Sequence, residues 1–206
     1  MNVHTLKVKW KEGELNQNTY VVEQEDGCIL IDAGVSIEEI RKITNKPILA
    51  VLLTHGHFDH IDYIEEYDEL KIPIYASIYT KKSMLDPNLN VSKMIKSRVY
   101  RVSKINELKD NETIKIGKME VKCLYTPGHS RDSVCYLIGD KLFSGDTLFS
   151  VSIGRTDFID SNNDEMIKSL SRLDNLDYKE LYSGHGRVSN KAEQNQNIKQ
   201  WLNILK

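Results

Sequence analysis

The chain has 206 residues, of which 40 % are apolar and 28 % are charged, as is usual for a globular protein. Its 28 Lys and Arg residues nearly balance its 30 Asp and Glu residues, which excludes a strongly basic overall charge of the kind that binds nucleic acid or an anionic membrane. No apolar run approaches the roughly 20 residues that cross a bilayer. Because the N-terminal residues also lack the apolar segment of a signal peptide, we expect a cytoplasmic protein without a membrane or nucleic-acid partner.

The three cysteines, Cys28, Cys123 and Cys135, are widely spaced and form no CxxC pair. Each lies in an apolar, strand-like run, which favours a reduced thiol packed in a core over a redox or catalytic thiol. The chemistry of the chain is therefore expected to reside in other residue types.

The N-terminal part of the chain begins with a predicted hairpin. Residues 19–24 and 28–32 are strand-like runs, and the Asp26-Gly27 pair between them is typical of a tight turn. Ser36 is a predicted helix N-cap, with Glu39 three residues later completing a capping box. The apolar positions predicted to form the buried stripe of this helix are Ile37, Ile40 and Ile43.

The continuous apolar run over residues 48–53 predicts a strand that is covered on both faces. Residues 60–70 have a helical period, followed by a short strand over 72–76 and a polar helical stretch from residue 77. The apolar positions of the first of these helices are Ile61, Ile64, Tyr67 and Leu70. Residues 86–111 have no readable pattern.

Strands dominate again in the second half of the chain. The predicted strands cover residues 113–116, 119–125, 133–138 and 141–144. Amphipathic helices over 162–173 and 191–205 flank one more short strand at 180–182. Two blocks of strands, each followed by helices, predict two sheets packed face to face with helices outside, a four-layer α/β arrangement in a single domain over residues 1–206.

The most informative stretch follows the buried strand of residues 48–53 directly. Three imidazoles and one carboxylate fall within six residues, where a rigid strand end can fix a short loop. These side chains belong to His55, His57, Asp59 and His60. Imidazole with carboxylate suits zinc, manganese or iron rather than calcium, and the absence of thiolates argues against a closed structural zinc site.

The remaining candidate ligands also follow predicted strands. A single histidine in a loop is usually only solvated, but the chain has six histidines and His129 and His185 both lie in turns at strand ends. Asp146 follows another apolar run, and this position favours a ligand over the turn-forming role that is common for Asp after Gly. His4 stands apart from the set. We therefore predict a metal site of seven residues.

Four motifs occur in order along the chain: HxHxDH at residues 55–60, TPGH at 126–129, SGDTLF at 144–149 and SGHG at 183–186. With Asp32 in the sequence LIDAG, this set resembles the metallo-β-lactamase superfamily. The aspartate at position 146 and the segment from Gly154 to Phe158 resemble its glyoxalase II-like branch, the hydroxyacylglutathione hydrolases and their small single-domain relatives. The resemblance implies an αββα sandwich with the metal site along one edge of the sheets.

The resemblance also implies a pair of divalent metal ions. One ion would be held by His55, His57 and His129, the other by Asp59, His60 and His185, and Asp146 would bridge both. Zinc is the expected metal, with iron and manganese as alternatives. By the same resemblance, Asp32 is a supporting residue near the metal loop.

The expected chemistry is hydrolysis of a small-molecule thioester or ester by a metal-bound hydroxide. Asp59 is the candidate catalytic residue, because it could orient the hydroxide or move its proton. Arg155 either contacts an anionic group of the substrate or only braces its loop, and Tyr63 is expected to narrow the pocket. Glyoxalase II has a further helical domain that binds glutathione, and only enough chain for one helix follows His185. A different or smaller acyl substrate is therefore the expectation.

Two other functions use similar ligands. Persulfide dioxygenases share HxHxDH and a similar segment around Arg155, and by resemblance His55, His129 and Asp146 would then hold a single iron. Metal-dependent ribonucleases of the superfamily are less favoured, because they commonly add an RNA-binding arm or domain and the charge of this chain is close to neutral.

Overall fold

Two six-stranded sheets form the centre of the fold in a computed structural model, which describes residues 1–9 and 16–205. The first sheet has the order β1-β2-β3-β4-β5-β6. Its strands are β1 (Asn2–Lys9), β2 (Asn16–Glu23), β3 (Cys28–Ile31), β4 (Ile48–Leu52), β5 (Ile74–Ser77) and β6 (Asn106–Leu108). The second sheet has the order β12-β11-β10-β9-β8-β7. Its strands are β7 (Thr113–Ile116), β8 (Met119–Tyr125), β9 (Val134–Ile138), β10 (Lys141–Gly145), β11 (Glu180–Ser183) and β12 (Ser189–Asn190).

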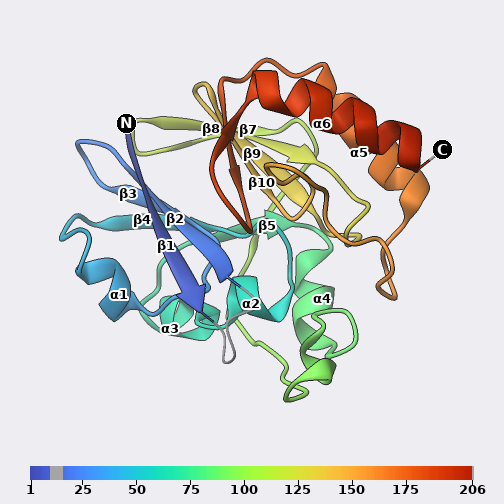
Figure 1. The fold of residues 1–206 in the computed structure, drawn as a ribbon. Helices are drawn as coiled ribbons and strands as arrows, with labels where there is room; N and C mark the ends of the chain where they lie inside the picture. The colour runs from blue at the N-terminus through green and yellow to red at the C-terminus, as the bar shows by residue number, and fades with distance from the viewer. Residues whose placement is uncertain (10–15, 206) are drawn as a thin grey trace.

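Helices cover the outer face of each sheet. On the first sheet lie α1 (Ile37–Arg41), α2 (Phe58–Ile61), α3 (Ile64–Glu69) and α4 (Thr80–Leu85), and on the second lie α5 (Asn163–Asp174) and α6 (Lys191–Ile204) (Figure 1). The helices and sheets form four layers, so the predicted αββα sandwich is confirmed. No helix among residues 1–9 and 16–205 is long and apolar enough to cross a membrane.

The alternating side chains of the first sheet contribute to two separate hydrophobic cores, one between the two sheets and one between the first sheet and its helices. In β3, Ile29 and Ile31 pack into the core between the sheets, whereas Cys28 and Leu30 pack against the helices of the first sheet. The side chains of a strand point alternately to its two faces, and here both faces are buried. This is why the sequence of β3 reads as a continuous apolar run rather than an alternating one.

Two helical predictions are corrected by long-range contacts. The helix expected over residues 60–70 is broken, because the backbone of Tyr63 leaves the helical conformation and its N–H donates to the carbonyl of Ala33 at 3.0 Å. Leu70, expected in the buried stripe, caps α3 and is 58 % exposed. Ile43 is also exposed, because α1 ends at Arg41, before the stripe reaches it.

The capping box predicted at the start of α1 is half formed. The Ser36 side chain accepts from the Glu39 N–H at 3.4 Å, as expected for an N-cap. The Glu39 carboxylate, however, pairs with Lys42 on the next turn.

The unreadable segment 86–111 contains a short 3-10 helix, η1 (Ser92–Met94), and strand β6. The side chain of Asn90 organises it, because its amide donates to the carbonyls of Met84 and Arg98 and its oxygen accepts from the Ser92 N–H. Val91, next to this amide, has a φ of 62°, a left-handed conformation that is strained for a β-branched residue. The conformation of this segment is set by side-chain hydrogen bonds between residues apart in sequence, and such contacts leave no periodic pattern in the sequence.

Candidate metal centre

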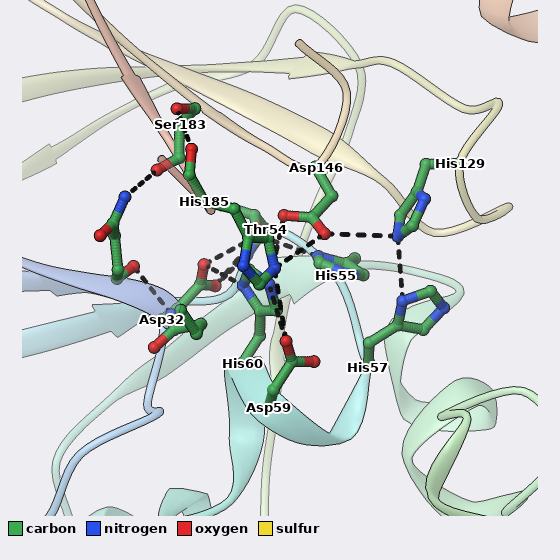
Figure 2. Close-up of polar contacts among 12 residues, drawn as sticks. Asp32, Thr54, His55, His57, Asp59, His60, His129, Asp146, Ser183 and His185 are labelled. Carbon is green, nitrogen blue, oxygen red and sulfur yellow. Dashed lines mark hydrogen bonds and ion pairs between the residues drawn. The ribbon is translucent and has the colours of Figure 1, made fainter. Parts of the chain in front are cut away.

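All seven candidate ligands lie at the C-terminal ends of strands. His55 and His57 follow β4, Asp59 and His60 lie in α2, His129 follows β8, Asp146 follows β10 and His185 follows β11. Figure 2 shows Asp146 and His129 approaching from one side, and His57, Asp59 and His60 from the loop and helix opposite. The two sheets therefore contribute side chains to one cluster.

Backbone hydrogen bonds join the two sheets at this edge. The Val134 N–H donates to the Thr54 carbonyl at 2.8 Å, and the Asn18 N–H donates to the Gly184 carbonyl at 2.7 Å. The Gly184 N–H in turn donates to the carbonyl of Gly145, the residue before Asp146. The loops that carry the ligands are thus tied to each other as well as to their own strands.

Glycine is required where these loops meet. A Cβ on Gly184 would lie 2.1 Å from Asp146 Oδ1 and 2.7 Å from His60 Cε1. A Cβ on Gly154 would lie 1.9 Å from the carbonyl oxygen of Asp146. Only a residue without a side chain permits so close an approach of backbone to ligand.

The ligand atoms fall into three overlapping groups, in each of which they all lie within 4.8 Å of one another. The groups are His55, His57 and His129; His55, His60 and Asp146; and Asp59, His60 and His185. The first and third groups share no residue, so the cluster offers two separate sets of donors. Mixed imidazole and carboxylate donors suit zinc, iron or manganese.

Asp146 lies between these two sets. Its Oδ2 is 3.6 Å from His129 Nε2 in the first set and 3.2 Å from His185 Nε2 in the second. Its Oδ1 is 3.2 Å from His60 Nε2 (Figure 2). One carboxylate therefore faces both sets of donors.

Hydrogen bonds at the far side of four imidazoles fix which nitrogen faces the cluster. The Nδ1 atoms of His55, His60, His129 and His185 face Thr54 Oγ1 at 3.1 Å, Asp32 Oδ2 at 2.7 Å, the Arg155 carbonyl at 2.8 Å and the Asn16 carbonyl at 3.0 Å, respectively. A carboxylate or carbonyl oxygen only accepts, so the imidazole Nδ1 donates and Nε2 faces the cluster. His57 differs, since its Nδ1 faces the cluster, 3.0 Å from His129 Nε2.

Several inward atoms lack a hydrogen-bond partner among the described residues. His55 Nε2 is buried and has no such partner, while the buried His60 Nε2 and Asp146 Oδ1 face each other at 3.2 Å as an ion pair without hydrogen-bond geometry. Buried polar atoms are nearly always satisfied, and these belong to ligand types that a divalent cation binds. The residues present therefore fit a metal centre.

Asp32 supports the centre from behind. Its carboxylate, 1 % exposed, accepts from the Thr54 N–H at 2.8 Å, from the Thr54 hydroxyl at 2.9 Å and from His60 Nδ1. Because the Thr54 hydroxyl donates to Asp32, its oxygen accepts from His55 Nδ1. Asp32 thus orients two candidate ligands, and it does so from a left-handed backbone with a φ of 66°.

The electrostatics of the metal-free protein differ between the two donor sets. Burial and the neighbouring imidazoles hold the pKa of His55 and His57 well below its ordinary value, so both are neutral. Burial alone would also lower the pKa of His60 and His185, but the neighbouring carboxylates together outweigh it: Asp146, Asp32 and Asp59 raise the pKa of His60, and Asp146 and Asp59 raise the pKa of His185 to about 10. The imidazoles of the first set (His55, His57 and His129) are therefore free of protons that a cation would have to displace. In the second set (Asp59, His60 and His185), both imidazoles are protonated.

A cavity of about 430 Å³ opens onto the cluster. It is lined by Val91, Met94 and Ile95 from one loop and by Ile153, Arg155 and Phe158 from another. The first of these loops belongs to the segment 86–111, whose sequence has no readable pattern. Tyr63, expected to narrow the pocket, is not among the lining residues; its backbone N–H is held by Ala33 and its side chain is 40 % exposed.

Arg155 serves the centre through its backbone. Its carbonyl accepts from His129 Nδ1, while its guanidinium forms two 2.8 Å bonds to Asp157 and lies over the Phe158 ring. These contacts brace the loop, which was one of the two predicted roles. Two further groups that hold candidate ligands were not predicted from the sequence: the Thr54 hydroxyl, which contacts His55, and the Asn16 carbonyl, which contacts His185. Neither belongs to a recognised motif, and only the position of Thr54 beside His55 pointed to it.

We expect Asp32→Asn to weaken metal binding by about 10- to 100-fold, because the amide loses the charge that orients His60. Zinc affinity measured by competition with a chromophoric chelator tests this. Asp164→Asn, at an exposed position in the first turn of α5, is the matched control. Equal affinity in Asp32→Asn and the control would contradict the supporting role.

Metal uptake at pH 7 should release about one to two protons per chain, because His60 and His185 must become neutral before they bind a cation. Their pKa values are raised in the metal-free protein, so the apparent affinity of the second set should increase with pH. Calorimetric titration with zinc in buffers of different ionisation enthalpy measures the released protons. Uptake of two ions without proton release would contradict the assignment.

Comparison with known proteins agrees with this geometry. The sequence pattern of the metallo-beta-lactamase superfamily matches residues 13–185. A Bacillus subtilis protein described as "Probable metallo-hydrolase YqgX" is 34 % identical, over 92 % of this chain and 96 % of its own. The hydroxyacylglutathione hydrolase of Buchnera aphidicola is 38 % identical, over 62 % of this chain and 45 % of its own. The crystal structure of the BLEG-1 B3 metallo-beta-lactamase superposes with a TM-score of 0.83 at 30 % identity, over 97 % of this chain and 99 % of its own. The chain belongs to the metallo-β-lactamase superfamily of metallo-hydrolases.

Proposed function

We propose that the chain is a binuclear metal-dependent hydrolase that cleaves thioesters or esters, with zinc as the expected metal. The observation that carries the proposal is the position of Asp146, whose carboxylate faces two separate sets of donors. His55, His57 and His129 would hold one ion, Asp59, His60 and His185 the other, and Asp146 would contact both.

A pair of divalent ions held by these residues would supply a water of lowered pKa and stabilisation of the negative charge that develops on a carbonyl oxygen. The residues of the chain supply the setting for this chemistry. Six of the seven candidate ligands are buried, all but His185, and the cavity beside them has a largely apolar wall. In such surroundings fixed charges act more strongly than in water.

Asp59 is the candidate proton acceptor. It lines the cavity, and its Oδ2 lies 3.4 Å from His185 Nε2. Burial would raise the pKa of Asp59, but the positive charges of His60 and His185 lower it, so the carboxylate is ionised at neutral pH. An ionised carboxylate facing the cavity can orient a water molecule and accept its proton at an oxygen.

Two arguments favour hydrolysis over the iron dioxygenase alternative. A single iron on His55, His129 and Asp146 would leave the second set, Asp59, His60 and His185, without a metal ion to bind. The three groups of close ligand atoms also do not include that triad. Similarity to a hydroxyacylglutathione hydrolase supports the thioester class, although it covers less than half of that relative.

The first test is the metal content of the purified protein, measured by elemental mass spectrometry without added metal. We expect about two ions per chain, and hydrolysis of at least one member of a panel of thioesters and esters that is abolished by a chelator and restored by zinc. One iron per chain, with oxygen consumption on a glutathione persulfide, would replace this proposal by the dioxygenase.

Asp59→Asn should lower kcat by about 100- to 10,000-fold in protein saturated with metal, because the amide cannot accept the proton. Metal content must be measured on the same sample, since Asp59 is also a candidate ligand. Asp164→Asn again serves as the control. Full turnover of Asp59→Asn with two ions retained would exclude the catalytic role.

A further inference from the structure

We propose that the cavity beside the metal centre is an acyl subsite, and that the preferred substrates carry an apolar acyl chain of medium length. This inference rests on the proposed hydrolase function and adds the substrate class to it. It is drawn from the lining of the cavity, from the exposed apolar side chains at its rim and from the pairing of its charged residue.

The cavity wall is apolar beyond the candidate ligands. Of the eight described lining residues that are not candidate ligands, seven are apolar and one, Arg155, is charged. A volume of about 430 Å³ lies within the range of sites that bury most of a small ligand. The carbonyl of a substrate would lie at the base of the cavity, beside Asp59 and Asp146, and the group attached to it would contact the apolar wall.

The rim of the cavity is more exposed than apolar side chains usually are. Met94 is 73 % exposed and Ile95 is 54 % exposed, and both line the cavity. Apolar side chains that gather in the open beside a site mark a surface that a ligand covers.

An outer groove of about 230 Å³ continues from the cavity. The two share Val91, Met94 and Phe158, and the groove is also lined by Ile159, which is 75 % exposed. The path from the metal centre to the surface is therefore apolar over much of its length. Lys93 also lines the outer groove, where its Nζ is bonded to Asn88 Oδ1 at 2.9 Å.

The charge of the cavity decides which part of a thioester fits it. Glutathione and coenzyme A are anionic thiols, and an anionic group needs an unpaired cation. In the cavity beside the metal centre, the Arg155 guanidinium is paired with Asp157 and stacks on Phe158, whereas Lys93 Nζ in the outer groove is bonded, among the described residues, only to the neutral Asn88 amide and could meet an anionic group there. The apolar wall therefore suits the acyl chain, and the thiol would extend away from it.

The Asn90 side chain and backbone hold the loop that carries Met94 and Ile95 in position beside the cavity. The Asn90 carbonyl accepts from the Phe58 N–H at 2.9 Å, which ties the loop to the first residue of α2. Its side chain holds both ends of the turn that presents Met94 and Ile95. The strained backbone of Val91 beside it is a further sign of a loop fixed by its surroundings.

The test is a series of thioesters of one small neutral thiol, N-acetylcysteamine, with straight acyl chains from acetyl to octanoyl. Release of free thiol by the zinc-loaded protein gives kcat/KM for each. We expect kcat/KM to increase about threefold for each added methylene until the cavity is filled, since each buried methylene contributes a nearly constant transfer free energy.

Variants then locate the effect. Met94→Gln and Ile95→Thr should each lower the ratio of octanoyl to acetyl kcat/KM by about fivefold, because each replaces apolar surface at the rim by a polar group. Ile43→Thr is the matched control, because Ile43 is partly exposed on the surface after α1 and lines neither cavity.

Titration of the zinc-loaded protein with straight-chain carboxylates, from acetate to octanoate, tests the subsite without turnover. Tighter binding of octanoate, weakened in Ile95→Thr, supports it. Turnover that is independent of acyl length would overturn the acyl subsite and leave the hydrolase proposal intact. If no thioester or ester is cleaved, the hydrolase proposal fails, and carboxylate binding that is independent of chain length then overturns the subsite as well.

Discussion

The centre of this molecule depends on one buried carboxylate. Asp32 has almost no contact with solvent. Its carboxylate is stabilised there by three hydrogen-bond donors, two from Thr54 and one from His60. A buried charge is tolerated only when it is paired and hydrogen-bonded. The same hydrogen bonds hold Thr54, the second residue after β4, in place. Asp32 therefore also helps to set the orientation of the His55 and His60 side chains. It orients His60 directly and His55 through the Thr54 hydroxyl.

The rest of the centre follows from balancing charges in a small space. Asp59 and Asp146 bring negative charge into the interior, and in the metal-free protein His60 and His185 compensate it by holding protons. Glycines at positions 154 and 184 remove the side chains that would separate these groups. Hydrogen bonds between the two sheets then keep the loops in register. Each of these features is local, but together they require that both sheets be complete and packed.

Much of this could be predicted from the sequence, because ligands placed directly after strands inherit their positions from the sheets. Most strands were readable from their apolar runs, although β1, β6 and β12 were not predicted, and the seven candidate ligands lie together as predicted. What could not be read depends on contacts between distant residues. The break at Tyr63 is made by the carbonyl of Ala33, and the turn at Val91 is made by the amide of Asn90. The apolar wall likewise comes from a loop with no periodic pattern, and Tyr63 was assigned to the pocket only by its proximity to the histidine motif.

The attachment of this loop has a consequence for how such proteins diversify. Asn90 clamps the turn at its two ends, at Met84 and Arg98, and the residues between them contribute the rim side chains Met94 and Ile95. None of the seven candidate ligands lies within that interval. Substitutions between the clamped ends would therefore change the rim of the proposed acyl subsite without replacing any candidate ligand. Selection can act on preference and on chemistry separately, as long as the asparagine remains.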